Sequence, residues 1–318
     1  MAMVHIERGL GRRPIRFVLG AMFRSKFLHR FFDSASTSRN LIATYDIVDV
    51  SKQENLTQIH PDESIGVVIQ GPIVQQVTFK MCNYLMKTYP KVKVVLSTWE
   101  NEDISEFKNL RGENFEICQS KKPSNTGPSN INFQILSTIA GINALSKFEC
   151  THILKTRTDI FLGNPQFLNY LSWMKGKGEP RAIVFSSFNS FLFRLYSPTD
   201  QVMFGTTADM TRYWSIDLVD QQEFVDFPEK YLFQKYLMTN GFDAIESFPS
   251  YLASLRKFAV IADHEQLGQV WNKGVFTSLS YRWRGNTFPN LMSPLSAWLW
   301  ESIKNDDNYV QELYDKIT

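Results

Sequence analysis

Residues 155–160 read Lys-Thr-Arg-Thr-Asp-Ile, and they directly follow the apolar run Thr151-His-Ile-Leu154. An apolar strand that ends in a short polar cluster places that cluster at the carboxyl edge of a sheet. In open α/β sheets, ligands bind at that edge. There, Asp159 is suited to hold a divalent cation against a diphosphate, and Arg157 is suited to pair with phosphate oxygens. The stretch therefore points to an α/β enzyme that handles a nucleotide-activated substrate.

Strand and helix patterns alternate in the chain that precedes this stretch. Short β-branched runs predict strands over residues 65–70, 92–97 and 115–118. Apolar residues spaced along one helix face predict helices over residues 76–88 and 130–147. With the strand that leads into Lys155, the order strand-helix-strand-strand-helix-strand predicts an α/β fold. Its central sheet should be mostly parallel, with helices on both faces.

Further elements follow the stretch and complete the predicted organisation. We expect strands at 181–186 and ending at Gly205, and helices that begin after Thr207 and at Pro228. The segment from residue 250 onward is rich in aromatic residues and could cover one side of a cleft. Three parts result: a basic arm and linker over 1–63, a catalytic α/β domain over 64–250, and an aromatic-rich segment over 251–318 that packs on the cleft.

The composition predicts a folded protein with a charged N-terminal arm. Of 318 residues, 43% are hydrophobic and 14% aromatic, which supplies a packed core and excludes global disorder. The formal net charge is +2, but residues 1–32 carry seven Lys or Arg against one acid, a net of +6. Residues 33–318 therefore carry the difference, −4. A mildly acidic body argues against nucleic acid as a partner.

The basic helical arm has two interpretations. Residues 1–32 are aromatic as well as basic, which suits attachment to an anionic membrane surface. A helix that packs on the body and exposes its charges is the alternative, because its apolar positions form no single stripe. No apolar run reaches the ~18 residues of a membrane span, and residues 17–23 lack the cleavage site of a secretory signal. We therefore expect a cytoplasmic protein, peripheral on the inner face of the cell membrane.

The cysteines and histidines form no metal-binding pattern. The three cysteines, Cys82, Cys118 and Cys150, and the five histidines lack the spacing of a zinc site. We interpret the cysteines as buried thiols of a reducing compartment.

Several blocks in a fixed order resemble the WavE lipopolysaccharide-synthesis family. They are Val67–Pro72, Leu96–Glu100, Asn130–Thr138 and Leu154–Ile160, followed by Asp200–Gly205 and Pro228-Glu229. The resemblance covers roughly residues 64–240. It implies a GT-A-like nucleotide-sugar fold and a glycosyltransferase that acts in assembly of lipopolysaccharide or capsule. The chain departs from the pattern twice: Phe133 stands where the family has arginine, and Arg157-Thr158-Asp159 replaces Asp-x-Asp, which leaves one carboxylate.

Candidate donor-binding residues lie at the predicted strand ends and on the helix over 130–147. They are Gln70, Gly71, Pro72, Glu100, Asn130, Gln134, Arg157 and Asp159. Glycine at position 71 permits close approach of backbone to a ligand, although a plain tight turn has the same sequence. Glu100 suits a base or ribose contact or an exposed loop. Asn130 and Gln134 suit either a cleft wall or a solvated helix face. As a metal site we expect Asp159 with Mn²⁺ or Mg²⁺, completed by donor phosphate oxygens and water.

Three acids compete for the role of catalytic base. Glu229 and Asp209 lie in the first turns of predicted helices, where the helix dipole stabilises the anion and capping is the alternative role. Glu229 leads because it lies in the resembling block, and Asp200 follows as a residue that could bind acceptor hydroxyls. His264 is a further candidate metal ligand, although a lone histidine is more often structural.

We therefore predict a glycosyltransferase that moves a sugar from a nucleotide-sugar donor to a glycan or lipid-linked glycan acceptor. One alternative is a sugar-phosphate nucleotidyltransferase, which normally has a basic Gly-rich loop after its first strand. The loop over 70–75 has no Lys or Arg. The other alternative is a non-catalytic scaffold that binds glycan or membrane through the aromatic tail and the basic arm.

Overall fold

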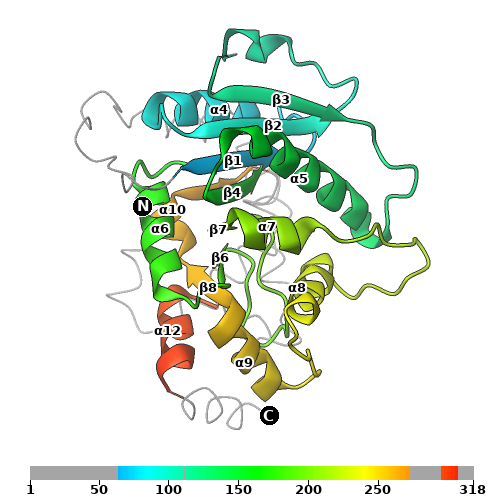
Figure 1. The fold of residues 1–318 in the computed structure, drawn as a ribbon, viewed down its shortest axis with the longest axis vertical. Coiled ribbons are helices and arrows are strands. Elements are labelled where there is room, and N and C mark those ends of the chain that lie inside the picture. Colours follow the sequence, from blue (N-terminus) through cyan, green and yellow to red (C-terminus); the bar gives the residue numbers. More distant parts are fainter. Residues whose placement is uncertain (1–63, 111, 273–294, 307–318) are drawn as a thin grey trace, which may run out of the picture.

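The computed structural model describes residues 64–110, 112–272 and 295–306 (Figure 1). The predicted arm and linker over 1–63 and much of the segment over 251–318 lie outside these ranges. The described residues form an α/β fold around a seven-stranded sheet with the order β3-β2-β1-β4-β7-β6-β8. The strands are β1 (Ile65–Gln70), β2 (Lys93–Trp99), β3 (Phe115–Ser120), β4 (His152–Arg157), β6 (Ile183–Ser186), β7 (Met203–Thr206) and β8 (Ala259–Ala262).

The sheet is parallel except for β7, which runs antiparallel to both of its neighbours. Its central strands are buried on both faces, which explains their nearly continuous apolar sequences. The expected α/β fold with a mostly parallel sheet is therefore confirmed.

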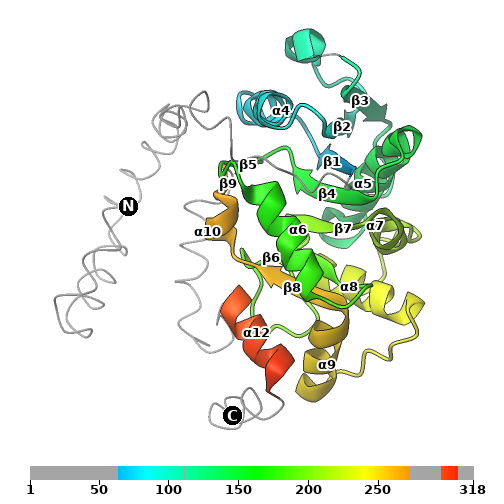
Figure 2. The ribbon, with the colours of Figure 1, turned by 60° about the vertical axis from the view of Figure 1, so that its left-hand side comes forward.

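Helices cover both faces of the sheet (Figure 2). Helices α4 (Val77–Thr88) and α6 (Phe167–Lys177) pack on one face, and α5 (Ile131–Leu145), α7 (Thr207–Trp214) and α8 (Pro228–Thr239) pack on the other. Gly141 allows α5 to lie close to β1, because a Cβ atom at this position would stand 2.5 Å from a methyl of Val68. Ser137, in the amino-terminal half of α5, contacts Gln70 at the end of β1, so this half of the helix lies at the carboxyl edge of the sheet.

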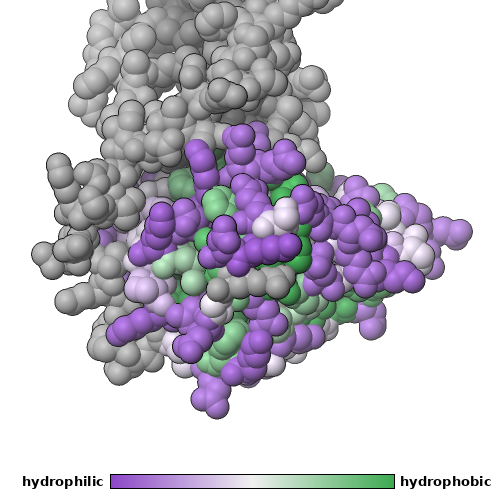
Figure 3. All heavy atoms as spheres, turned by 90° about the horizontal axis from the view of Figure 1, so that it is seen from above, coloured by the Kyte–Doolittle hydropathy of each residue, from purple (hydrophilic) through white to green (hydrophobic). Residues whose placement is uncertain are grey.

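In the described sheet, strand β3 lies at the edge with β2 as its neighbouring strand, and it is half exposed. Figure 3 views the molecule from the top of Figure 1, where β3 and α4 lie, and shows mostly hydrophilic side chains on that face. Polar and charged residues on an edge strand discourage pairing with another chain.

The order of the strands creates a switch point between β1 and β4. From β1 the chain moves outward through β2 and β3, and it then returns to place β4 on the other side of β1. Crossovers in opposite directions leave a crevice outside the carboxyl ends of the two central strands. In the register, Gln70 at the end of β1 lies between Ser97 of β2 and Arg157 of β4.

The structure also contains elements that the sequence patterns did not predict. These are α6, α9 (Phe248–Phe258), β8, α10 (His264–Leu267), α12 (Ala297–Asn305) and a small sheet of β5 (Ile160–Leu162) with β9 (Gln269–Trp271). Strand β8 completes the main sheet, and β9 pairs with the segment that follows Asp159. Residues 251–272 are therefore integrated into the α/β domain.

Candidate functional site

The ends of β1 and β4 meet in a tight backbone junction. The Thr158 N–H donates to the Gln70 carbonyl, and the Gly71 N–H donates to the Ser97 carbonyl, both at 3.0 Å. Gly71 has a φ of 124°, and a Cβ there would lie 2.9 Å from Thr158 Oγ1. Only glycine fits this conformation and this approach without strain. Pro72 follows as an exposed residue, so the backbone is open to solvent just beyond the junction.

Arg157 and Asp159 form a two-pronged ion pair at this junction. Arg157 Nε and Nη2 each donate to one oxygen of Asp159 at 2.9 Å. Trp271 Nε1, brought in by β9, also donates to Asp159 Oδ2 at 2.9 Å. Burial acts to raise the pKa of Asp159, but these hydrogen bonds and the charge of Arg157 hold that pKa below its usual range. Asp159 therefore stays ionised and fixes the guanidinium in place.

Lys155 is a fully buried cation on the face of β4 that also carries Arg157. Its ammonium donates to the main-chain oxygen of Asp200 and lies 3.9 Å from Asp200 Oδ2 and 4.8 Å from the centre of the Trp214 ring. Burial lowers the pKa of Lys155 to about 8, and the Asp200 charge opposes this shift. The sequence patterns did not assign Lys155 a role, although a lysine inside an apolar strand was a signal for one.

Glu229 lies in the first turn of α8 and pairs with Arg194. Arg194 Nη2 donates to Glu229 Oε2 at 3.2 Å. Burial raises the pKa of Glu229, and the nearby Asp200 charge raises it further, whereas Arg194 acts in the opposite direction. Two buried atoms, Arg194 Nε and Asp200 Oδ2, have no hydrogen-bond partner within the described ranges. The Arg194 Nε and Asp200 Oδ2 atoms are therefore available to form hydrogen bonds with a ligand.

The amino end of α5 forms another wall of this region. Ser137 donates to Gln70 Oε1 at 2.8 Å, and Phe133 packs on Trp99 at the end of β2 with the ring centres 5.3 Å apart. In the part of the chain that the structure describes, the buried Oε1 of Gln134 also lacks a hydrogen-bond partner. Asn130 is exposed and has a φ of 63°. Phe133 thus serves to pack the helix against the sheet.

Two other predicted residues lie in different surroundings. Glu100 is exposed in the turn after β2, and its N–H donates to the Ser120 carbonyl. Asp209 lies near the amino end of β4, because Thr206, the residue before α7, pairs with His152. The structure therefore brings together Gln70, Gly71, Arg157, Asp159, Asp200 and Glu229, with Gln134 on the adjoining helix α5, and it places Asp209 at the opposite end of β4.

The surroundings of Asp159 do not fit a divalent cation. Both carboxylate oxygens already accept hydrogen bonds from Arg157, and one also accepts from Trp271. Over residues 64–110, 112–272 and 295–306 there is no group of three His, Cys, Asp or Glu side chains that could hold a metal ion. His264 lies 2.9 Å from Ser187 Oγ and packs on Phe188. The cation predicted at Asp159 thus competes with a guanidinium for the same oxygens.

The fold and this cluster define an α/β protein with a charged site outside the carboxyl ends of its central strands. The chain belongs to the WavE lipopolysaccharide synthesis family, whose model matches residues 65–247. The resemblance drawn from the sequence blocks is confirmed. No curated protein matches the chain in sequence.

Solved structures with a similar arrangement include transferases of two kinds. Glucosyl-3-phosphoglycerate synthase from Mycobacterium tuberculosis, in complex with Mn²⁺, UDP and phosphoglyceric acid, is 12% identical over 70% of this chain and 79% of its own, with a TM-score of 0.42. A glycosyltransferase involved in glycosylation of the major capsid of PBCV-1 is 12% identical over 63% and 82%, with a TM-score of 0.36. A cytidylyltransferase from Leptospira borgpetersenii is 12% identical over 80% and 97%, with a TM-score of 0.38.

None of the helices in the described ranges has the length and apolar character needed to cross a membrane.

Proposed function

We propose that this protein is a glycosyltransferase that moves a sugar from a nucleotide-sugar donor to a growing surface glycan, in lipopolysaccharide or capsule. One observation carries the proposal. Glu229, a carboxyl group whose pKa is raised, lies beside Arg194 and near Arg157 and Asp200, outside the carboxyl edge of an α/β sheet. Such a carboxyl group suits a general base, and the neighbouring guanidinium groups suit a leaving diphosphate.

In the proposed reaction, Glu229 takes the proton from an acceptor hydroxyl. The acceptor oxygen forms a bond to the anomeric carbon, and the bond between that carbon and the nucleoside diphosphate breaks. The departing diphosphate gains negative charge, which Arg194 is positioned to stabilise through its Nε, an atom without a hydrogen-bond partner among the described residues. Asp159 holds Arg157, and Lys155 holds Asp200, so both act as positioning residues.

The backbone around Gly71 and the side chain of Gln134 are the proposed contacts for the donor nucleotide. Glycine at position 71 leaves room for a ligand to approach the main chain. The buried Oε1 of Gln134 is an acceptor suited to a ribose hydroxyl or a base amino group. Glu100 and Asn130, in exposed positions at the same edge, are the proposed outer boundary of this subsite.

Cation dependence and location are further parts of the proposal. Arg157 supplies positive charge beside Asp159, and no step of the proposed reaction is assigned to Mn²⁺ or Mg²⁺. The proposed acceptor is a glycan or lipid-linked glycan at the cytoplasmic face of the membrane, where the basic residues of segment 1–32 favour an anionic surface.

A sugar-phosphate nucleotidyltransferase would use a similar edge of the sheet. It would be expected to carry basic residues in the loop after β1, but this loop has none between Gln70 and Phe79. The products separate the two activities: a glycosyltransferase releases a nucleoside diphosphate from a nucleotide sugar, and a nucleotidyltransferase releases pyrophosphate from a nucleoside triphosphate.

Thermal unfolding with UDP, GDP and CMP, each with Mn²⁺, Mg²⁺ or EDTA, tests the donor site. A ligand at 100 times its Kd stabilises a protein by about 2.7 kcal/mol, which raises Tm by several degrees. We expect one nucleotide to raise Tm, in EDTA as well as with a cation, and Arg194→Met to abolish the shift. Arg212→Met is the matched control, because Arg212 also pairs with an acid, Asp209, at the other end of β4.

If none of the nucleotides changes Tm, the proposed donor site is wrong, and a scaffold that binds glycan or membrane becomes the better interpretation. A shift that occurs only with Mn²⁺ or Mg²⁺ would instead mean that Arg157 releases Asp159 to a cation.

A further inference from the structure

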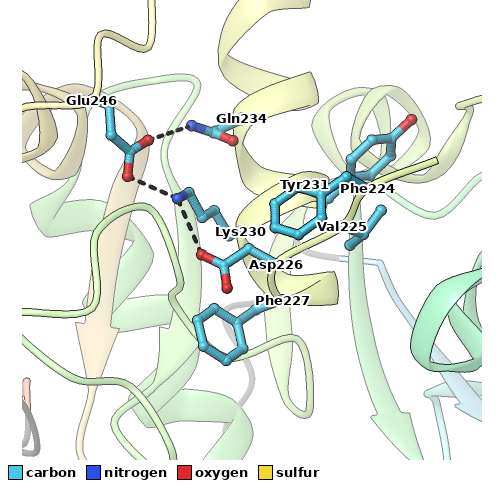
Figure 4. Close-up of a pocket in the computed structure, with 8 residues that line it drawn as sticks. All are labelled: Phe224, Val225, Asp226, Phe227, Lys230, Tyr231, Gln234 and Glu246. Atoms are coloured by element: carbon cyan, nitrogen blue, oxygen red, sulfur yellow. Dashed lines mark hydrogen bonds and ion pairs between the residues drawn. The ribbon is translucent and has the colours of Figure 1, made fainter.

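A pocket lies on the outer side of the first turns of α8, next to the proposed site (Figure 4). Its volume is about 230 Å³, and its aromatic lining consists of Phe224, Phe227 and Tyr231. Phe224 is 88% exposed. This volume is below the roughly 300–1,000 Å³ of sites for drug-sized ligands. The pocket therefore suits a small group with apolar faces, and it is too small for a whole nucleotide.

Polar side chains form the opposite wall of the pocket. Lys230 lies between two carboxylates, 3.4 Å from Asp226 and 2.7 Å from Glu246, as Figure 4 shows. Gln234, one turn further along α8, also donates to Glu246. The wall thus offers several oxygen acceptors, and its two acids outweigh its one ammonium group. Hydroxyl groups of a neutral ligand can donate to these oxygens, whereas a carboxylate or phosphate ligand is repelled.

A direct chain of contacts joins this pocket to the proposed base. The Phe227 ring lies 3.7 Å from the Arg194 guanidinium, measured to the ring centre, and Arg194 in turn holds Glu229. The loop that carries Phe224 is fixed at its other side, because the Asn132 side chain of α5 bonds both the N–H and the carbonyl of Val219. One loop therefore runs from the amino end of α5 to the pocket.

We infer that this pocket is the acceptor subsite and that it binds a neutral or amino-substituted sugar ring of the glycan. The apolar face of a pyranose stacks on the exposed Phe224 ring, and its hydroxyls bond to the wall around Lys230. Phe227, the residue before α8, lines the pocket and packs on Arg194, which holds Glu229, so a glycan that extends from the pocket past Phe227 leads toward the base. This inference rests on the proposed function, since it gives the same site its acceptor class.

Saturation-transfer NMR with maltotriose, chitotriose and tetragalacturonate tests the subsite. We expect the two neutral oligosaccharides to bind and tetragalacturonate to bind more weakly, because of the acids around Lys230. Phe224→Ala should weaken binding of the neutral oligosaccharides about three- to tenfold, the range for loss of one stacked aromatic contact. Met238→Ala is the matched control: Met238 is also exposed on α8, but near its carboxyl end.

Equal binding by wild type and Phe224→Ala, no binding by any of the oligosaccharides, or preference for tetragalacturonate would overturn the inference. The Tm shifts with nucleotides, measured on the same samples, keep the two ideas separate. A nucleotide shift without oligosaccharide binding leaves the donor site intact and removes the subsite. Oligosaccharide binding that depends on Phe224, without any Tm shift from a nucleotide, supports the subsite and contradicts the donor site.

Discussion

Helices α7 and α8 both begin with an acid in their first turn, and the two acids have opposite surroundings. Asp209 of α7 lies near the amino end of β4, and Glu229 of α8 lies in the charged cluster outside its carboxyl end. In sequence the two positions look alike, and both suit a helix amino end by dipole and capping.

The hydrogen bonds of the two acids separate their roles. Thr206 Oγ1 donates to Asp209 Oδ2 at 2.6 Å and accepts from the Asp209 N–H, while Arg212 donates to Asp209 Oδ1 at 3.0 Å. Both carboxylate oxygens of Asp209 thus accept hydrogen bonds from neighbours within three residues, and Tyr236 of α8 also donates to Oδ1 at 3.2 Å. Glu229 instead pairs with Arg194, 35 residues away, and has a like charge, Asp200, nearby. An acid whose two oxygens both accept hydrogen bonds from nearby residues stabilises a helix end. A buried acid whose pKa is raised by a neighbouring negative charge is suited to proton transfer.

Replacement of Glu229 by glutamine should show the largest difference between the roles of Glu229 and Asp209. The amide keeps the shape but cannot take a proton, so kcat for sugar transfer should fall by about 10²–10⁴-fold. Binding of the nucleoside diphosphate should persist. Because the folded protein raises the pKa of Glu229, its charge costs stability as pH rises from the unfolded pKa through the folded one. Glu229→Gln should therefore unfold at neutral pH no more easily than wild type.

Steady-state kinetics and thermal unfolding of the same preparation check both parts of this prediction. If Glu229→Gln keeps kcat within a few-fold of wild type, Glu229 is not the base, and Asp200 becomes the first candidate.

The fold was largely predictable because its central strands have clear local sequence patterns. Strand β1 is a continuous β-branched run that ends at Gly71-Pro72, and α5 has clear helical periodicity. Strand β8 escaped prediction for a local reason as well. It has only four residues and follows α9 without a break, so no turn residues mark where it begins.

The site was predictable only where a single segment carries it. Arg157 and Asp159 lie two residues apart at the end of one strand, so the sequence predicts that both lie at the same edge of the sheet. Arg194 lies in an aromatic stretch without periodicity, and its importance arises from contacts with Phe227 and Glu229. Such contacts depend on how the loop after β6 packs against the start of α8. The spacing of residues within either segment does not predict this packing.

Removal of the Asp209 side chain should affect stability and leave catalysis nearly intact. Asp209→Ala deletes the acceptor of three hydrogen bonds, from Thr206, Arg212 and Tyr236, and leaves the Thr206 hydroxyl without that partner. The expected loss in the free energy of unfolding is about 1–3 kcal/mol. Urea unfolding measures this loss, and the turnover rate should stay within a few-fold of wild type. If a folded variant instead turns over at least about a hundredfold more slowly, Asp209 acts in the reaction.

The smallest expected effect is a shift, in Asp200→Asn, of the pH at which kcat/KM falls on the acid side of its pH profile (the acid limb). In the proposed reaction Glu229 must be deprotonated, so activity should fall as pH drops through its pKa, which burial and Asp200 raise above the usual 4.5. Asp200→Asn removes the like charge, and the midpoint of the limb in the normalised profile should move to lower pH. Asp209→Asn should leave the midpoint unchanged, because Asp209 lies at the other end of β4.

A limb that does not move in Asp200→Asn would mean that burial alone raises the pKa of Glu229. A wild-type limb with its midpoint below the usual carboxyl value of 4.5 would assign the proton transfer to another group.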